Sequence, residues 1–248
     1  MFLKALTILL IPILLIQGRK VKKNTLRLPE PEGLREGITG QGKPLSILIV
    51  GDSAAAGVGV LQQNDALLGC LLKELSTEFK IEWKLHAKTG NTTSQVMYSL
   101  DDLNDNHYDV VVTSIGVNDV TKFMSADIWM NKQVKLYEKI KEKFSPNLMI
   151  ATGVPPMQKF PALPNPLAWL FGLYAQQMNH QLEGFVLKQQ NMEWIKYDLE
   201  KYRSLNLTMA EDGFHPSKEV YKIWAQEIAY KIHNGINKSP ELNHHYGV

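Results

Sequence analysis

The chain has 248 residues, enough for one large domain with its own hydrophobic core. Hydrophobic residues make up 44% of it and charged residues 21%, a globular composition that excludes a disordered protein. The formal net charge is +2, but residues 1–45 carry eight Lys or Arg against three Glu, so the rest of the chain carries −3. This mildly acidic body argues against a nucleic-acid groove, and the basic excess beside an apolar segment favours a membrane surface.

Residues 5–17 form an apolar segment that is shorter than the roughly 20 residues a helix needs to span hydrocarbon. Its length fits the core of a signal peptide, but no small-x-small cleavage site follows it. A basic cluster follows instead, comprising Arg19, Lys20, Lys22 and Lys23, which would keep the next domain cytoplasmic by the positive-inside rule. Three interpretations stay open: an uncleaved membrane anchor or interfacial helix, an export signal to the periplasm or the medium, and a buried N-terminal element.

The sequence predicts four segments. Residues 1–23 are the anchor or signal-like segment with its basic flank, and Pro12 is expected to kink any helix there. Residues 24–45 are rich in glycine and proline, which is typical of a linker. The folded domain is expected over residues 46–234, with a C-terminal tail over 235–248.

Within the expected domain, short apolar runs alternate with amphipathic segments. Strands are predicted at residues 47–50, 81–85, 110–112 together with Ile115, 148–151 and 192–197. Helices are predicted at residues 62–79, 92–103, 128–144, 168–190 and 216–232. Five strands alternating with five helices predict a three-layer α/β/α sandwich with a mostly parallel sheet.

Four candidate residues follow the ends of these strands. Ser53 follows the first strand, Gly90 the second, Asn118 the third and His215 the fifth. In open parallel sheets the ligand binds at the carboxyl ends of the strands. We therefore expect the four residues to meet at one edge of the sheet.

These residue types suit nucleophilic catalysis. A serine needs an adjacent base, and Asp212, three residues before His215, can hold that imidazole on a single turn. Taken alone, Asp212 is better explained as a cap of the following helix. The backbone N–H of Gly90 and the side-chain amide of Asn118 can donate hydrogen bonds to an oxyanion. Asp119, next to Asn118, is expected to be a structural hydrogen-bond acceptor.

The chain resembles the SGNH (GDSL) hydrolase superfamily of bacterial lipases and esterases over about residues 46–234. The resemblance rests on four blocks in the family's order: Gly51-Asp52-Ser53, Gly90, Gly116-x-Asn118-Asp119 and Asp212-x-x-His215-Pro216. The chain departs from the common pattern at Ala54, where many members have leucine. That position is tolerant in the family.

The resemblance implies a flavodoxin-like fold and a carboxylic ester hydrolase that works through an acyl-enzyme intermediate. It makes Ser53 the nucleophile, His215 the base and Asp212 the group that orients the base. The oxyanion hole would comprise the N–H groups of Ser53 and Gly90 and the Asn118 amide. No metal or organic cofactor is implied. The single cysteine, Cys70, excludes an intrachain disulfide, and its apolar neighbours predict a buried structural thiol.

Residues 155–171 contain five prolines and are expected to form a stiff loop rather than a helix. Its apolar side chains either line an acyl pocket or cover the sheet, and the candidates are Met157, Phe160, Leu163, Trp169 and Phe171. An apolar loop near a membrane-proximal segment favours small-molecule or lipid-like esters with short to medium acyl chains.

The alternatives on the same fold are a carbohydrate O-acetylesterase or acyltransferase, and a thioesterase or lysophospholipase. A membrane-tethered binding module without activity is disfavoured because every catalytic position is intact. The expected location is the cytoplasmic side of a membrane, reached through residues 5–17, with export as the alternative.

Overall fold

Six strands form one sheet in the order β1-β3-β2-β4-β5-β6 in the computed structural model, which describes residues 2–205 and 207–238. The strands are β1 (Glu36–Thr39), β2 (Lys43–Gly51), β3 (Phe79–Ala87), β4 (Val110–Ser114), β5 (Leu148–Thr152) and β6 (Met192–Ile195). All pair in parallel except β1, which pairs antiparallel with β3 at one edge. The predicted mostly parallel α/β sandwich is confirmed, with six strands in place of five.

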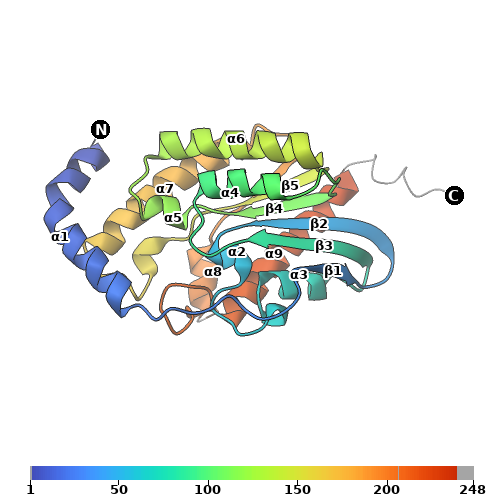
Figure 1. Ribbon diagram of the computed structural model, residues 1–248, viewed down its shortest axis with the longest axis horizontal. Helices are drawn as coiled ribbons and strands as arrows, with labels where there is room; N and C mark the ends of the chain where they lie inside the picture. The colour runs from blue at the N-terminus through green and yellow to red at the C-terminus, as the bar shows by residue number, and fades with distance from the viewer. Residues whose placement is uncertain (1, 206, 239–248) are drawn as a thin grey trace.

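Helices cover both faces of the sheet (Figure 1). One face packs against α4 (Thr93–Ser99), α6 (Ala126–Phe144) and α7 (Leu167–Val186), and the other against α3 (Leu67–Leu75) and α9 (Lys218–Lys238). In β2, Leu48 and Val50 join the first core, while Ile47 and Ile49 join the second. A strand buried on both sides needs apolar residues at successive positions, which explains the continuous run in the sequence.

Shorter helices lie in the connections. They are α2 (Ser53–Ala56), α5 (Val117–Val120), α8 (Leu199–Ser204) and three 3-10 turns, η1 (Gln63–Asp65), η2 (Leu100–Asp102) and η3 (Met157–Lys159). Helix α2 begins directly after β2, and α5 begins shortly after β4. Both therefore start at the edge of the sheet where the parallel strands have their carboxyl ends.

The expected linker is in part a strand, which corrects the prediction for residues 24–45. The segment contains β1 and the start of β2. Its glycines serve close packing: a Cβ on Gly37 would lie 2.9 Å from the Trp83 ring, while Gly40 and Gly42 adopt φ of +84° and +117° between the strands. A glycine-rich composition therefore marked a tight turn and an edge strand rather than a flexible spacer.

Two helix boundaries differ from the pattern. The helix expected over 62–79 is η1 followed by α3, and the buried Gln63 side chain donates a tertiary hydrogen bond of 2.8 Å to the Ala56 carbonyl. Cys70, within α3, is buried as expected. In the expected loop, α7 already starts at Leu167, because Pro166 precedes the first turn without needing a free N–H.

The chain ends differ as well. The last helix runs to Lys238, so the first residues of the expected tail 235–248 are helical, and 239–248 lie outside the described residues. The first helix, α1 (Phe2–Asn24), is curved and continues through Pro12 (Figure 1). It packs on α7: Leu3 and Leu14 are buried, and the Thr7 and Tyr174 hydroxyl oxygens lie 3.0 Å apart. Within the described chain, no helix is both long and apolar enough to cross a bilayer.

Candidate active site

The turn after β2 delivers Ser53 to the carboxyl edge of the sheet. The Asp52 N–H donates to the Ser114 carbonyl at the end of β4 over 3.1 Å. Gly51 is required by this close approach, because a Cβ there would lie 2.3 Å from the same carbonyl oxygen. Asp52 then caps α2 by accepting the Ala54 N–H on Oδ1 over 3.1 Å. Ser53 is therefore the first residue of a short helix held by the two central strands.

The segment from Asp212 to His215 folds around its own carboxylate. Asp212 Oδ1 accepts the backbone N–H groups of Phe214 and His215 over 2.9 and 3.0 Å. Its other oxygen lies 2.5 Å from His215 Nδ1, and His215 Nε2 lies 2.9 Å from Ser53 Oγ. Three side chains from two distant segments thus form one continuous hydrogen-bonded chain.

Gly213 and Phe214 anchor that segment to the proline-rich loop. Gly213 has φ of +64°, and its carbonyl accepts the Ala162 N–H over 3.2 Å. Phe214 packs edge-on against Phe160, with ring centroids 5.0 Å apart. A substitution at either position would therefore move Asp212 and His215 together.

The charge on Asp212 is set by competing effects. Burial by itself would raise its pKa, but the hydrogen bonds from the His215 ring and from the backbone N–H groups of His215 and Phe214 lower the pKa below its usual value. The carboxylate is therefore ionised at neutral pH. An ionised carboxylate beside Nδ1 favours the His215 tautomer with its proton on that nitrogen, which leaves Nε2 as an acceptor facing Ser53 Oγ.

Gly90 and Asn118 come from neighbouring loops at the same edge. The Lys88 N–H donates to the Gly51 carbonyl over 3.2 Å, and Asn118 Nδ2 donates to the Asn91 carbonyl over 2.9 Å. These bonds link the loop that holds Gly90 to the end of β2 on one side and to α5 on the other. Gly90 has φ of +85°, a conformation that favours glycine.

Asp119 is the structural acceptor that the pattern predicts. It is fully buried and accepts both the N–H and the Oγ1–H of Thr93, over 3.0 and 2.8 Å. These bonds tie α5 to the start of α4.

A cavity of about 480 Å³ opens beside Ser53 and His215. Its lining is mainly apolar, and much of it comes from three connections: residues 115 and 117 after β4, residues 153–156, 159 and 160 after β5, and residues 207–209 before the Asp212 segment. A volume of this size is within the range of small-molecule sites. Ser53 thus opens onto a mainly apolar chamber.

The sequence matches the GDSL-like lipase/acylhydrolase family over residues 49–223. The chain belongs to this family. It is therefore a carboxylic ester hydrolase, as its SGNH-type blocks indicate. No curated protein sequence matches it significantly.

Solved structures of a lipolytic protein and of two esterases share the fold. A lipolytic G-D-S-L family protein from Veillonella parvula superposes with a TM-score of 0.61 at 14% identity, covering 75% of this chain and 96% of that one. Esterase EstA from a Pseudoalteromonas species superposes with a TM-score of 0.56 at 17% identity, covering 77% of this chain and 98% of EstA. Axe2, an acetylxylan esterase from Geobacillus stearothermophilus, superposes with a TM-score of 0.58 at 18% identity, covering 77% of this chain and 95% of Axe2. At these identities the likeness concerns the fold.

In this GDSL enzyme only one of the five candidate pocket residues lines the cavity. Phe160 lines the cavity, whereas Met157, Leu163 and Phe171 are buried in the core around α7, and Trp169 is 45% exposed on α7. The reason is that η3 and the early start of α7 turn these side chains away from the catalytic edge. The cavity instead uses side chains that carry no periodic signal, such as Val117, Val154, Leu207 and Met209.

Asp52, next to Ser53, is a buried carboxylate whose pKa lies well above its usual value. Burial raises its pKa to about 7, more than the Ala54 N–H and His215 lower it. A pKa raised in the folded state means that the stability linked to Asp52 is full below the unfolded value of 3.8 and is lost as the pH rises toward 7.

We therefore expect Asp52→Asn to become more stable relative to wild type as the pH rises. Between pH 4 and pH 8 the difference in unfolding free energy should shift in favour of the variant by roughly 2–4 kcal/mol. Urea unfolding of both proteins across that pH range measures the difference in unfolding free energy. Asp212 and His215 are present in both proteins, so their contributions cancel in the difference. Parallel curves for the two proteins would contradict the raised pKa.

Proposed function

We propose that this enzyme hydrolyses carboxylic esters with short to medium acyl chains through an acyl-enzyme on Ser53. One observation carries the proposal: the Asp212, His215 and Ser53 side chains are hydrogen-bonded in sequence, at 2.5 and 2.9 Å, beside an apolar cavity. This is the arrangement that turns a weakly nucleophilic hydroxyl into a reactive one.

In the proposed reaction His215 Nε2 takes the Ser53 proton as Oγ attacks the ester carbonyl. The N–H groups of Ser53 and Gly90 and the Asn118 amide stabilise the negative charge that develops on the carbonyl oxygen. The His215 proton passes to the leaving alcohol. Water then attacks the acyl-enzyme with His215 as base again, which releases the acid and restores Ser53.

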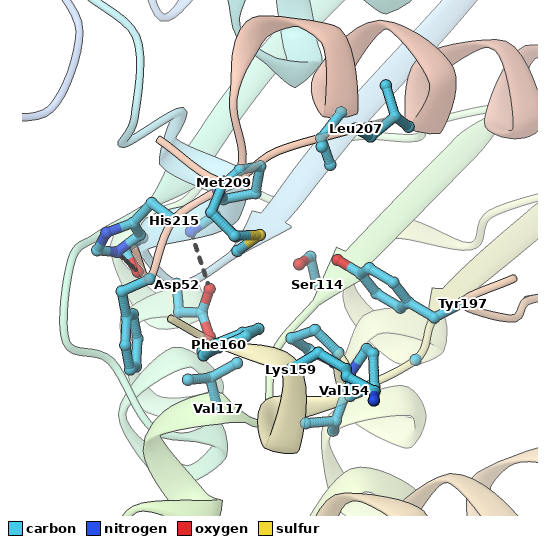
Figure 2. Close-up of a pocket in the computed structure, with 18 of the residues that line it drawn as sticks. Asp52, Ser114, Val117, Val154, Lys159, Phe160, Tyr197, Leu207, Met209 and His215 are labelled. Atoms are coloured by element: carbon cyan, nitrogen blue, oxygen red, sulfur yellow. Dashed lines mark hydrogen bonds between the residues drawn. The ribbon is translucent and has the colours of Figure 1, made fainter. Parts of the chain in front are cut away.

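The apolar lining supports an aliphatic acyl group as the occupant of the cavity. Phe160, Val117 and Met209 line it near the catalytic residues (Figure 2). A methylene chain gains roughly 0.8 kcal/mol for each buried CH₂ on such a surface, whereas an acetyl group on a sugar would leave most of it uncovered. Thioesters and lysophospholipids carry the same acyl chemistry and belong in the same substrate panel.

A fluorophosphonate probe tests the proposal directly. The probe should add its mass to the peptide that holds Ser53, and p-nitrophenyl butyrate hydrolysis should fall in proportion to labelling. Peptide mass spectrometry and a parallel rate assay follow the two quantities. Labelling of a different serine with equal loss of activity, or an unlabelled folded protein without activity, would overturn it.

We also propose that α1 holds the enzyme on an anionic membrane surface, on the cytoplasmic side. The α1 face opposite α7 remains apolar, with Ile8, Leu9, Leu15 and Ile16 all more than half exposed. The basic residues that follow are all exposed: Arg19, Lys20, Lys22 and Lys23. An apolar helix face beside a cluster of cations suits a helix that lies in the interface rather than spans the bilayer.

For this surface we expect Leu9→Glu to weaken binding to vesicles of phosphatidylglycerol and phosphatidylcholine by about tenfold or more, since it puts a charge where a leucine side chain enters the interface. Vesicle co-sedimentation measures the partitioning. Leu187→Glu is the matched control, because Leu9 and Leu187 are both 76% exposed and Leu187 lies at the end of α7. Equal binding of wild type and Leu9→Glu, or a stable dimer that ignores vesicles, would contradict the proposal.

A further inference from the structure

The cavity beside Ser53 also has a polar side. Ser114, Tyr197 and Lys159 line it together with the apolar residues. Figure 2 shows the Tyr197 hydroxyl pointing toward Ser114, while the Ser114 hydroxyl points away from Tyr197, toward the side of Met209; Lys159 lies below both in this view. These side chains come from the ends of β4 and β6 and from η3, so three separate elements converge there.

Ser114 is the most informative of the three. The residue is 6% exposed, and its hydroxyl has no hydrogen-bond partner among the described residues. At the end of the next strand, by contrast, the buried Thr152 hydroxyl donates to the Thr113 carbonyl over 3.0 Å. Ser114 Oγ is not one of the sealed, unpaired side-chain atoms of the described residues, because Ser114 lines the cavity and its hydroxyl can meet solvent or a ligand there. A hydroxyl that lines a cavity without a protein partner is suited to pair with a ligand.

Lys159 brings a cation to the same side. In the described part of the chain it forms no salt bridge, and its backbone is held in η3 by a 2.9 Å hydrogen bond to the Pro156 carbonyl. Asp52 is the one carboxylate among the cavity-lining residues; it is buried at α2 and caps Ala54. The cavity thus combines an apolar wall with the Ser114 and Tyr197 hydroxyls and with a lysine that forms no salt bridge to any described residue.

We propose that Ser114, Tyr197 and Lys159 bind an anionic oxygen group that the substrate carries beyond its ester. This inference rests on the proposed ester hydrolysis and narrows its substrate class to esters with a second, negatively charged end. A carboxylate at the end of the acyl chain and a phosphate on the alcohol share this chemistry. Either would accept hydrogen bonds from the hydroxyls while pairing with the ammonium group.

Two matched pairs of esters separate the two sources of the anion. Monomethyl adipate and methyl hexanoate differ at the far end of the acyl chain, whereas 1-hexanoylglycerol 3-phosphate and 1-hexanoylglycerol differ on the alcohol. Initial rates by pH-stat titration should give a kcat/KM about tenfold higher for the anionic member of one pair, mostly through a lower KM. The pair that responds identifies the end that carries the charge.

Variants test the assignment through the anionic-to-neutral ratio of kcat/KM. Lys159→Met should bring that ratio close to one, Lys159→Arg should keep most of it, and Ser114→Ala should lower it several-fold. Lys188→Met is the control, since Lys188 is exposed beyond the far end of α7 and should leave the ratio and both rates as in wild type.

The outcomes distinguish this inference from the function on which it rests. Hydrolysis of the neutral esters without preference for either anionic partner would overturn the anion site and leave the esterase proposal intact. A preference that survives in Lys159→Met would also overturn it. Hydrolysis of none of the four esters, with no phosphonate labelling of Ser53, would overturn the esterase proposal itself.

Discussion

Ser53→Ala is expected to lower kcat for p-nitrophenyl butyrate by about 10⁴–10⁶-fold, because the variant has no oxygen at the position 2.9 Å from His215 Nε2. No acyl-enzyme can then form, and the oxyanion donors act only on direct attack by water. Steady-state rates at saturating ester measure the loss, and fluorophosphonate labelling should vanish with it.

The fold should tolerate this change, because the Ser53 hydroxyl is partly exposed at the cavity. Thermal unfolding of the variant should stay within a few degrees of wild type. Ser76→Ala, at the end of α3 beside the opposite edge of the sheet, is the matched control and should keep full activity. Wild-type turnover by Ser53→Ala would refute the assignment of the nucleophile.

Asp212→Asn is expected to lower kcat by about 10³–10⁴-fold. The asparagine can keep the geometry of the turn, since its oxygen can still accept the N–H groups of Phe214 and His215. It cannot supply the negative charge that fixes the His215 proton on Nδ1 and stabilises the imidazolium formed during the reaction. The loss should appear in kcat with little change in KM.

The same variant has a signature in stability. The pKa of Asp212 is lowered in the folded state, so its contribution is present above the unfolded pKa and is lost as the pH falls through the folded one. Relative to Asp212→Asn, wild type should therefore be more stable at neutral pH, and the difference should shrink in acid. Asp105→Asn, a mostly exposed carboxylate paired with Lys143, is the control for both measurements. Full activity in Asp212→Asn would remove Asp212 from the triad.

The sequence pattern predicted the strands of the central sheet because a strand buried on both faces needs an unbroken run of apolar residues. Strands β2 and β4 lie inside the sheet, and their apolar runs are identifiable from the order of the residues. The edge strand β1 left no such trace, since its four residues are only partly covered and its glycines resemble those of a linker.

Four of the five acyl-pocket candidates lie away from the cavity, for a different reason. Met157, Leu163 and Phe171 are apolar residues of the proline-rich segment, and an apolar residue serves the core as readily as a cavity. Which one it serves depends on how η3 and the start of α7 are oriented. Only Phe160, which packs on Phe214 beside His215, had the position that the prediction required.

The amino-acid sequence predicted the parallel α/β framework and the candidate residues at the strand ends, because the alternation of strands with helices and the Asp212-x-x-His215 spacing are local properties of the chain. Two features of the site became evident only in the tertiary structure. One is the 2.9 Å approach of His215 to Ser53, which are 162 positions apart. The other is the composition of the cavity, in which Ser114, Lys159 and Tyr197 meet although no motif links them. Contacts between loops depend on how each loop crosses the edge of the sheet, and hydrophobic periodicity does not encode that path.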